Sequence, residues 1–199
     1  MMTYDMHGLW DLNNNWTGPF LNSHTNLTEI REALDLLWRN NVSPSKVVLG
    51  LGFYGRAFTV RDPKCMEPGC LFKDAAKGGK CTREPGILMN SEIDEIVAQR
   101  KIVPILNKDA AVKIVAWDDQ WVTHDDEETI KMKATFARGL CLSGLAVWAI
   151  SHDNENATYS LALGAAVQGE ETSWRRRGGE SIAKVPIAQC KWTACGESA

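Results

Sequence analysis

Two short apolar segments constrain the fold of this chain more than any other feature. Residues 46–53 and 142–150 are hydrophobic runs without the polar alternation of a half-exposed strand. Such runs are typical of strands buried on both faces, as in a parallel sheet. A helical pattern of apolar residues at about 27–40 precedes the first run. A segment at about 126–138 with an acidic first turn and basic later turns, the charge order that suits the helix dipole, precedes the second run, and a further helix is expected over 155–167. Helix and strand in regular succession predict a parallel α/β architecture.

Polar residues mark the ends of the predicted helices. Asn26 and Glu29 are three residues apart, which is the spacing of a capping box at the start of the first helix. Asp125 or Asp126 is placed to cap the second helix. Gly139 fits the left-handed position just after that helix. These signals place both helix boundaries to within a few residues.

Residues 59–124 interrupt this succession with clustered cysteine, glycine and proline. A short helix is expected near residues 91–100, and a strand with alternating polarity at 112–117. These features predict an α+β subdomain inserted between a strand and the helix that follows it. Residues 1–5 have the pattern of one more strand. The chain is therefore expected to have four parts: residues 1–58, the inserted subdomain 59–124, residues 125–168, and a linker with the start of a cysteine-rich tail at 169–199.

The composition excludes several classes of partner. The sequence has 22 basic and 25 acidic residues and a net charge of −3, so no nucleic-acid partner is expected. Its longest apolar stretch is about 12 residues, shorter than the roughly 20 that span a bilayer, so no membrane partner is expected. His152 and Asp153 have no second histidine at ligand spacing. The sequence therefore predicts no metal and no cofactor.

Cysteines and glycosylation signals indicate an exported parent protein, although residues 1–7 lack the pattern of a signal peptide. The six cysteines are an even number, typical of disulfide-bonded chains. They allow about fifteen pairings, and the sequence does not choose among them. Asn-x-Ser/Thr signals occur at Asn15, Asn26, Asn41 and Asn156. We therefore expect an extracellular parent whose N-terminal part is missing from this chain.

The predicted strand ends carry residues suited to ligand binding. In parallel α/β proteins, the side chains that contact a ligand gather at the carboxyl ends of the strands. The residues at the three strand ends are Tyr4, Asp5 and Trp10, then Tyr54 and Arg56, and finally Trp148. Aromatic rings cover the apolar faces of sugar units, while charged groups bond the hydroxyls at their edges. The set therefore favours a neutral, hydroxyl-rich ligand.

These strand ends resemble one known family. Residues 2–5 (MTYD), 50–56 (GLGFYGR) and 144–150 (GLAVWAI) resemble the sixth, seventh and eighth strands of glycoside hydrolase family 18, the chitinases. Residues 121–126 resemble the segment that closes the insertion subdomain of that family. Residues 190–196 resemble the cysteine-rich region of its fungal, killer-toxin-like branch. Because three strand motifs occur in order at suitable spacing, the chain is identified as the C-terminal portion of a family 18 chitinase.

The resemblance implies a fold and a reaction. The fold is a partial (β/α)8 TIM barrel, formed by its last three strands, with an inserted α+β subdomain. The ligand is chitin or an N-acetylglucosamine oligosaccharide. Family 18 enzymes hydrolyse β-1,4-linked N-acetylglucosamine polymers with retention, and the acetamido carbonyl of the substrate acts as the nucleophile. One protein carboxylic acid is then enough, because it only has to protonate the leaving group.

The resemblance also implies roles for individual residues. Tyr4 and Asp5 correspond to catalytic positions: the Tyr4 hydroxyl is expected to hold the acetamido group in line, and Asp5 to contact the sugar or orient its neighbours. Trp148 is expected to form the floor under the distorted sugar, and Trp10 to stack on the leaving-group side. The other substrate-binding residues implied for the same cleft are Met2, Tyr54 and Arg56.

One family motif is missing. The acidic pattern Asp-x-x-Asp-x-Asp-x-Glu does not occur in the 199 residues. General acid catalysis contributes about 10²–10⁴ in rate, so no appreciable chitinase activity is expected from this chain alone. The first five strands are expected on a missing N-terminal half of the barrel, which is a candidate partner. Two alternatives stay open: a non-catalytic chitin-oligosaccharide-binding protein, and an inert disulfide-stapled structural fragment.

Overall fold

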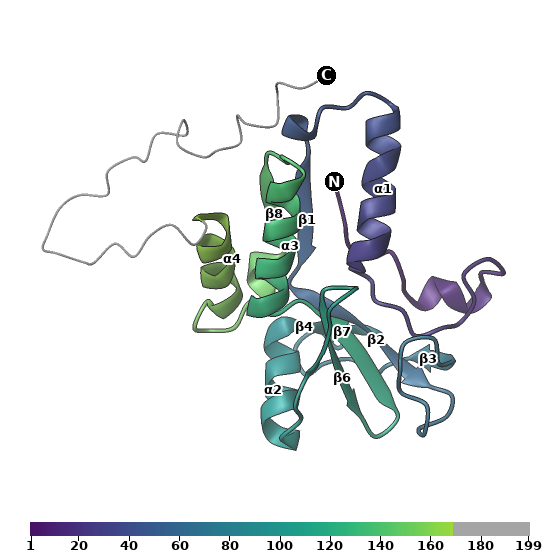
Figure 1. The fold of residues 1–199 in the computed structure, drawn as a ribbon. Helices are drawn as coiled ribbons and strands as arrows, with labels where there is room; N and C mark the ends of the chain where they lie inside the picture. Colours follow the sequence, from purple (N-terminus) through teal and green to yellow (C-terminus); the bar gives the residue numbers. More distant parts are fainter. Residues whose placement is uncertain (169–199) are drawn as a thin grey trace, which may run out of the picture.

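The computed structural model describes residues 1–168, which form two sheets and the helices that cover them (Figure 1). The helices are α1 (Leu27–Arg39), α2 (Asn90–Arg100), α3 (Glu127–Gly139) and α4 (Thr158–Gln168), with short 3-10 turns η1 (Leu9–Asn13), η2 (Pro44–Lys46) and η3 (Ile150–His152). The strands are β1 (Val48–Gly52), β2 (Tyr54–Val60), β3 (Phe72–Ala75), β4 (Ile87–Met89), β5 (Ile105–Asn107), β6 (Val112–Trp117), β7 (Gln120–His124) and β8 (Gly144–Trp148).

Strands β1 and β8 pair in parallel, from Val48 opposite Gly144 to Gly52 opposite Trp148. The N-terminal residues run along the other edge of β1. The Met1 amino group donates to the Val48 carbonyl at 2.8 Å, and the Gly50 N–H donates to the Met1 carbonyl at 2.9 Å. This is the hydrogen-bond pattern of a parallel neighbour. The expected first strand is therefore represented by strand-like bonding at its start, without a regular strand over residues 1–5.

Helices α1, α3 and α4 pack against this parallel pair and form its core. Buried apolar residues from all three helices meet those of β1: Ile30, Leu34, Leu49, Leu51, Phe53, Ile130, Ala137 and Tyr159. The combination of parallel strands and covering helices confirms the predicted partial barrel. Every residue of β1 after Val48 is buried, as predicted. The same prediction was wrong for β8, in which no residue is buried and Trp148 is 60% exposed.

The helix boundaries follow the sequence signals, with two corrections. The Asn26 side chain caps α1 by accepting from the Thr28 N–H, but Glu29 does not complete the capping box. Its carboxylate bonds His7 instead, 22 residues away in sequence. Of the two predicted candidates, Asp125 and Asp126, the residue that caps α3 is Asp126. Gly139 is the last helical residue, and the left-handed position is taken by Cys141, with φ of 57°.

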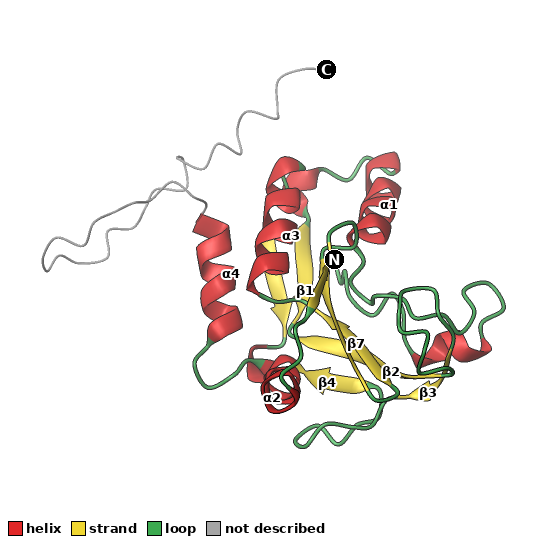
Figure 2. Cartoon of the chain, turned by 60° about the horizontal axis from the view of Figure 1, so that its bottom comes forward, coloured by secondary structure: helices red, strands yellow, loops and turns green. Residues whose placement is uncertain are grey.

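The second sheet is antiparallel, with strand order β3-β2-β7-β6-β5 and β4 beside β2. Figure 2 shows it below the parallel pair, with α2 at its side. Apolar residues of α2, such as Ile93, pack against one face of this sheet. The predicted helix at 91–100 and strand at 112–117 correspond to α2 and β6. Because β2 begins at Tyr54, the expected boundary after residue 58 falls inside this strand, and we propose that the subdomain starts at Tyr54.

Cys65 and Cys70 form a disulfide, which is one bridge of the expected set, and Cys81 is a free, exposed thiol. The predicted linker and cysteine-rich tail at 169–199 lie outside the described residues. Within residues 1–168, no helix has the length and apolarity needed to cross a membrane.

Candidate functional site

The candidate site begins at two glycines of β1 that leave space for tyrosine rings. A side chain at Gly50 would come within 3.0 Å of the Tyr4 ring, and one at Gly52 would come within 3.0 Å of the Tyr54 ring. Residues two apart on a strand point to the same face. Tyr4 and Tyr54 therefore lie over one face of β1, with their ring centroids 6.1 Å apart in an edge-to-face arrangement.

Asp5 lies at the centre of the polar contacts on this face. Its Oδ1 accepts from the Tyr54 hydroxyl at 2.6 Å and from Arg56 Nε at 2.8 Å, and its Oδ2 is 2.8 Å from Arg56 Nη2. The two guanidinium contacts make the pair bidentate, which fixes the direction of both side chains. Tyr54 and Arg56 are two residues apart on β2, so this strand of the inserted sheet delivers both groups to Asp5.

These contacts fix the charge of each group. Burial alone would raise the pKa of the Asp5 carboxyl, but the hydrogen bonds donated by Arg56 and Tyr54 and the charge of Arg56 hold that pKa far below its usual value. Burial and the adjacent Asp5 carboxylate raise the pKa of the Tyr54 hydroxyl. Asp5 is therefore a carboxylate and Tyr54 a hydrogen-bond donor at every ordinary pH. Asp5 accordingly lacks the proton that a general acid must hold.

Trp10 joins the site through Arg56. The Arg56 guanidinium carbon lies 4.8 Å from the centroid of the Trp10 ring, within the range of a cation–π contact. Trp10 belongs to η1 and is 45% exposed, so part of its ring remains open to a ligand. The structure thus brings Tyr4, Asp5, Trp10, Tyr54 and Arg56 into one connected cluster, although η1 and β2 are more than 40 residues apart in sequence.

Trp148 and Met2 lie at the margin of this cluster. Trp148 pairs with Gly52, so its side chain lies on the same side of the sheet as the space that Gly52 leaves for Tyr54. The peptide between Trp148 and Ala149 is cis. The Met2 Cα lies near Gly50, but its side chain is 75% exposed. Neither ring contacts nor hydrogen bonds within residues 1–168 link these two side chains to the central cluster.

His24 is a site residue that sequence reasoning missed. The Asp5 N–H donates to His24 Nδ1 at 3.3 Å, and His24 Nε2 lies 3.0 Å from the Tyr54 carbonyl, so the proton is on Nε2. Full burial lowers the pKa of the His24 imidazole, which agrees with a neutral ring. The ring also lies 4.9 Å from that of Tyr54. No periodic pattern points to an isolated histidine before a helix, so only the fold reveals it.

His24 also holds an unusual backbone conformation at Asp5. Asp5 has φ of +62°, in the left-handed region that residues with a side chain rarely adopt. The Asp5 N–H bonds the His24 ring, and the next N–H, of Met6, bonds the His24 carbonyl at 3.1 Å. His152, also missed, lies edge-on to Tyr54 with centroids 5.8 Å apart.

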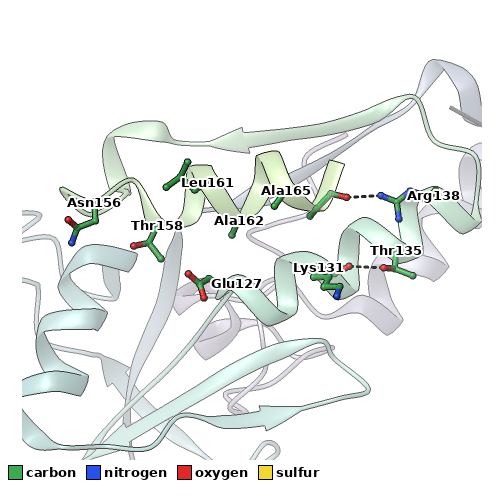
Figure 3. Close-up of a pocket in the computed structure, with 10 residues that line it drawn as sticks. Glu127, Lys131, Thr135, Arg138, Asn156, Thr158, Leu161, Ala162 and Ala165 are labelled. Carbon is green, nitrogen blue, oxygen red and sulfur yellow. Dashed lines mark hydrogen bonds between the residues drawn. The ribbon is translucent and has the colours of Figure 1, made fainter. Parts of the chain in front are cut away.

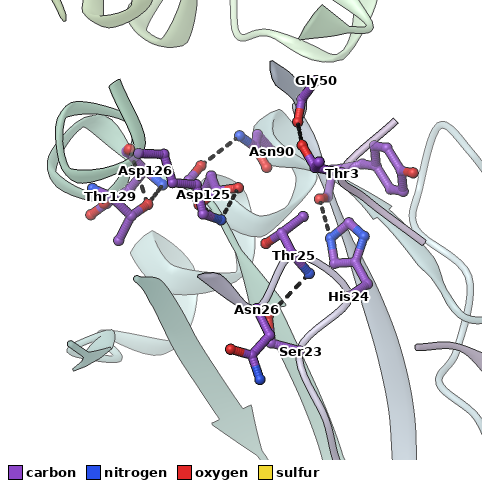
Figure 4. A network of polar contacts seen from close by, with 12 residues as sticks. Thr3, Ser23, His24, Thr25, Asn26, Gly50, Asn90, Asp125, Asp126 and Thr129 are labelled. Carbon is purple, nitrogen blue, oxygen red and sulfur yellow. Dashed lines mark hydrogen bonds and ion pairs between the residues drawn. The ribbon is translucent and has the colours of Figure 1, made fainter. Parts of the chain in front are cut away.

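Buried polar contacts lie beside the site (Figure 4). Thr3 Oγ1 donates to the Gly50 carbonyl, and Asn90 Nδ2 donates to the Asp125 carbonyl at 2.9 Å. The Asp125 carboxylate pairs with Lys133 Nζ, and both side chains are fully buried. Because Asp125 directly follows β7 and Lys133 lies on α3, this ion pair fixes the turn that leads from β7 into α3.

A second concave region lies elsewhere. A groove of about 770 Å³ runs between α3 and α4 (Figure 3). Charged residues of α3, such as Glu127 and Arg138, line one side, and apolar residues of α4, such as Leu161, line the other. None of its lining residues belongs to the predicted site. Within residues 1–168, no cluster of three histidine, cysteine or acidic residues is arranged to hold a metal ion.

Parallel strands backed by helices, with an α+β subdomain inserted after one strand and aromatic and charged side chains at the strand ends, define a portion of an α/β-barrel protein. The particular family follows from the sequence comparison: residues 1–153 match the glycosyl hydrolases family 18, and the chain belongs to this family. The predicted portion of a fungal-type family 18 chitinase is confirmed.

Three relatives show how much of a longer protein the chain represents. The probable chitinase LysM11 of Penicillium expansum is 30% identical over 172 residues, covering 75% of this chain and 15% of that protein. The secreted chitinase LysM12 of the same fungus is 30% identical over 170 residues, covering 78% and 11%. Human YKL-39, described as a pseudo-chitinase with retained chitooligosaccharide binding properties, superposes with a TM-score of 0.75 at 20% identity, covering 85% of this chain and 50% of that one. The chain thus spans at most half the length of these relatives.

Proposed function

We propose that this chain carries the substrate-binding cleft of a family 18 chitinase and binds chitin oligosaccharides without cleaving them on its own. The observation that carries the proposal is the cluster around Asp5, where Tyr54, Arg56 and Trp10 are held in fixed orientations beside the carboxyl end of β1. Fixed aromatic and polar groups on an open surface are what a sugar chain requires.

Each residue has a stated role in this proposal. The Tyr4 hydroxyl makes no hydrogen bond within residues 1–168, so it is available to the acetamido group of a bound sugar. Asp5 orients Tyr54 and Arg56 rather than transferring a proton, because both of its oxygens accept from them. The exposed faces of Trp10 and Trp148 stack on sugar rings, and Met2 adds apolar contact at the edge.

The absence of cleavage follows from the chemistry of the acid. A general acid must be protonated at working pH and reach the glycosidic oxygen. Asp5 is ionised, and the acidic motif of the family does not occur in the sequence. We propose that the acid belongs to the N-terminal half of a complete barrel, which is then the partner of this chain. We also propose that the parent protein is extracellular, and the secreted relative from Penicillium supports this.

Calorimetric titration with the N-acetylglucosamine tetramer tests the proposal. We expect binding, and we expect Trp148→Ala to weaken it by about tenfold or more, since a lost aromatic platform removes stacking. Trp16→Ala is the matched control, because Trp16 is 97% exposed and lies outside the cluster. No binding by the wild-type chain would favour an inert structural fragment.

A parallel incubation with chitin distinguishes the remaining alternatives. The chain should remain bound to the solid and release no soluble oligosaccharide, as a non-catalytic binder also would. Addition of the N-terminal half of a family 18 barrel distinguishes part of a hydrolase from a non-catalytic binder. Cleavage should appear only if this chain is part of a hydrolase. Release of oligosaccharide by the chain alone would contradict the assignment of the acid to another segment.

A further inference from the structure

His7 occupies an unusual position next to the proposed binding site. Its side chain is 7% exposed, and both ring nitrogens face carboxylates. Nδ1 lies 2.8 Å from Asp11 Oδ2, and Nε2 lies 2.8 Å from Glu29 Oε1. Asp11 belongs to η1 and Glu29 to the first turn of α1, so the ring joins two elements.

The geometry fixes the protonation state of this ring. A neutral imidazole has one N–H and one lone pair, whereas the imidazolium has two N–H donors. With a carboxylate at each nitrogen, only the imidazolium donates to both, and a neutral ring would turn a lone pair toward a carboxylate oxygen. Burial would lower the pKa of His7, but its bonds to Glu29 and Asp11 outweigh burial and raise that pKa above its usual value.

The same contacts hold the segment that carries Trp10. Asp11 also accepts from the Gly8 N–H at 3.3 Å and, through Oδ1, from the Thr17 hydroxyl at 2.9 Å, so it ties η1 to the residues on both sides of it. The Trp10 ring folds back over Gly8, where any side chain would collide with it. The ring is thus held between the backbone beside His7 and the guanidinium of Arg56.

We propose that His7, as an imidazolium bonded to both Asp11 and Glu29, is a positioning residue that holds Trp10 over Arg56, and that loss of its proton sets the upper pH limit of sugar binding. The proposal rests on the proposed function, because it concerns affinity at that site. Asp11 from η1 and Glu29 from α1 are the charged groups that face the ring. Deprotonation removes the histidine hydrogen bond of one carboxylate and turns a lone pair toward it, which loosens η1.

One substitution separates the charge of His7 from its hydrogen bonds. In Glu29→Gln, the amide can donate to Nε2 of a neutral ring or accept from the N–H of a charged one. Both the neutral and the charged ring of His7 then make a hydrogen bond at each nitrogen, so the position of Trp10 no longer depends on pH. Glu29 is partly exposed and on a helix, so this variant preserves the fold. In His7→Gln, a single amide cannot bridge carboxylates on opposite sides.

The experiment titrates the full chain with the N-acetylglucosamine tetramer between pH 5 and pH 9. The affinity of the wild-type protein should fall by about three- to tenfold above the pKa of His7, the range that a lost aromatic contact accounts for. The affinity of Glu29→Gln should stay constant over the same range, and that of His7→Gln should be low throughout. A wild-type affinity that is independent of pH, or an equal fall in Glu29→Gln, overturns the proposal.

Proton and nitrogen NMR of the His7 ring and the Trp10 indole provides a readout that needs no sugar. Burial lowers the pKa values of His24, His124 and His152, so a histidine that titrates above the usual range is His7. The Trp10 indole signal should shift with it in the wild type and not in Glu29→Gln. If no sugar binds at any pH, the proposed function fails, but the joint titration of His7 and Trp10 still tests whether His7 holds Trp10. An indole signal that does not change when His7 titrates overturns the proposal.

Discussion

Strands β7 and β8 have opposite surroundings, although β8 is the more apolar of the two: β7 contains Gln120, Thr123 and His124, and β8 has no polar side chain. All five residues of β7 are buried, whereas none of the five residues of β8 is. β7 lies between β2 and β6 and is covered by α2, while β8 pairs only with β1 among the described residues. Trp148 is 60% exposed and Ile150, just beyond the strand, is 71% exposed. The inserted subdomain therefore completes its own core, and the barrel portion does not.

This difference shows what an apolar run in the sequence can and cannot predict. A run of apolar residues reports that a segment is stable when it is covered, because burial of apolar surface is favourable. It does not report whether the covering atoms belong to the same chain. An exposed apolar face of this kind marks a place where another element packs. For β8, we propose that this element is the N-terminal half of the barrel.

The largest expected effect comes from the buried ion pair at the turn where β7 leads into α3. Asp125→Ala leaves the Lys133 ammonium buried without a counter-charge and should reduce the free energy of unfolding by about 3–5 kcal/mol. Urea denaturation measures this loss. The double variant Asp125→Leu with Lys133→Met should recover most of the stability, since no buried charge remains. A loss below about 1 kcal/mol in Asp125→Ala would mean that the pair is open to solvent, because an exposed ion pair contributes little to stability.

A matched pair of valines tests the comparison directly. Val122 in β7 is fully buried, and Val147 in β8 is only partly buried. Val122→Ala should destabilise the protein by about 2 kcal/mol, because two methyl groups leave a packed core. Val147→Ala should cost less than about 1 kcal/mol. Equal losses, measured in the same urea series, would show that β8 is as well packed as β7 in solution.

Local signals were sufficient to predict the elements but not their partners. The spacing of Ile30 and Leu34 identified α1, and the pair Asp125 and Asp126 marked the start of α3, because helix periodicity and capping involve neighbours in sequence. Glu29 matched a local capping motif, yet its carboxylate bonds His7. A partner 22 residues away depends on the path of η1, which no local pattern encodes.

In the candidate site too, local sequence signals identified some residues, and others depend on contacts between distant parts of the chain. Tyr54 and Arg56 could be selected because they follow a predicted strand, and their resemblance to a family motif reinforced the choice. His24 could not, because it lies between elements and contacts Asp5 only through the fold. The boundary of the inserted subdomain was placed after residue 58, inside β2, because composition changes there while strand pairing begins at Tyr54.

A smaller effect is expected from the pH dependence of the Asp5 contacts. The pKa of Asp5 is lower in the folded protein than its ordinary value of 3.8, so its contacts stabilise the fold above that pH and are lost as the pH falls below it. The stability difference between wild type and Asp5→Asn should be below about 1 kcal/mol, because the side chain is partly exposed. It should stay constant from pH 5 to 7 and shrink below pH 4. A difference that grows with acidity would contradict the ionised state of Asp5.

Amide hydrogen exchange along β7 and β8 tests, residue by residue, whether β8 is less well covered than β7. Exchange protection reports the free energy of local opening, and strands bonded on both edges open least. Amides of β7 should therefore exchange more slowly than those of β8, whose outer edge has no strand partner within residues 1–168. Adding the N-terminal half of the barrel should slow exchange in β8 and leave β7 unchanged. Equal protection in the isolated chain would mean that β8 is already covered, and the proposed partner would lose its physical basis.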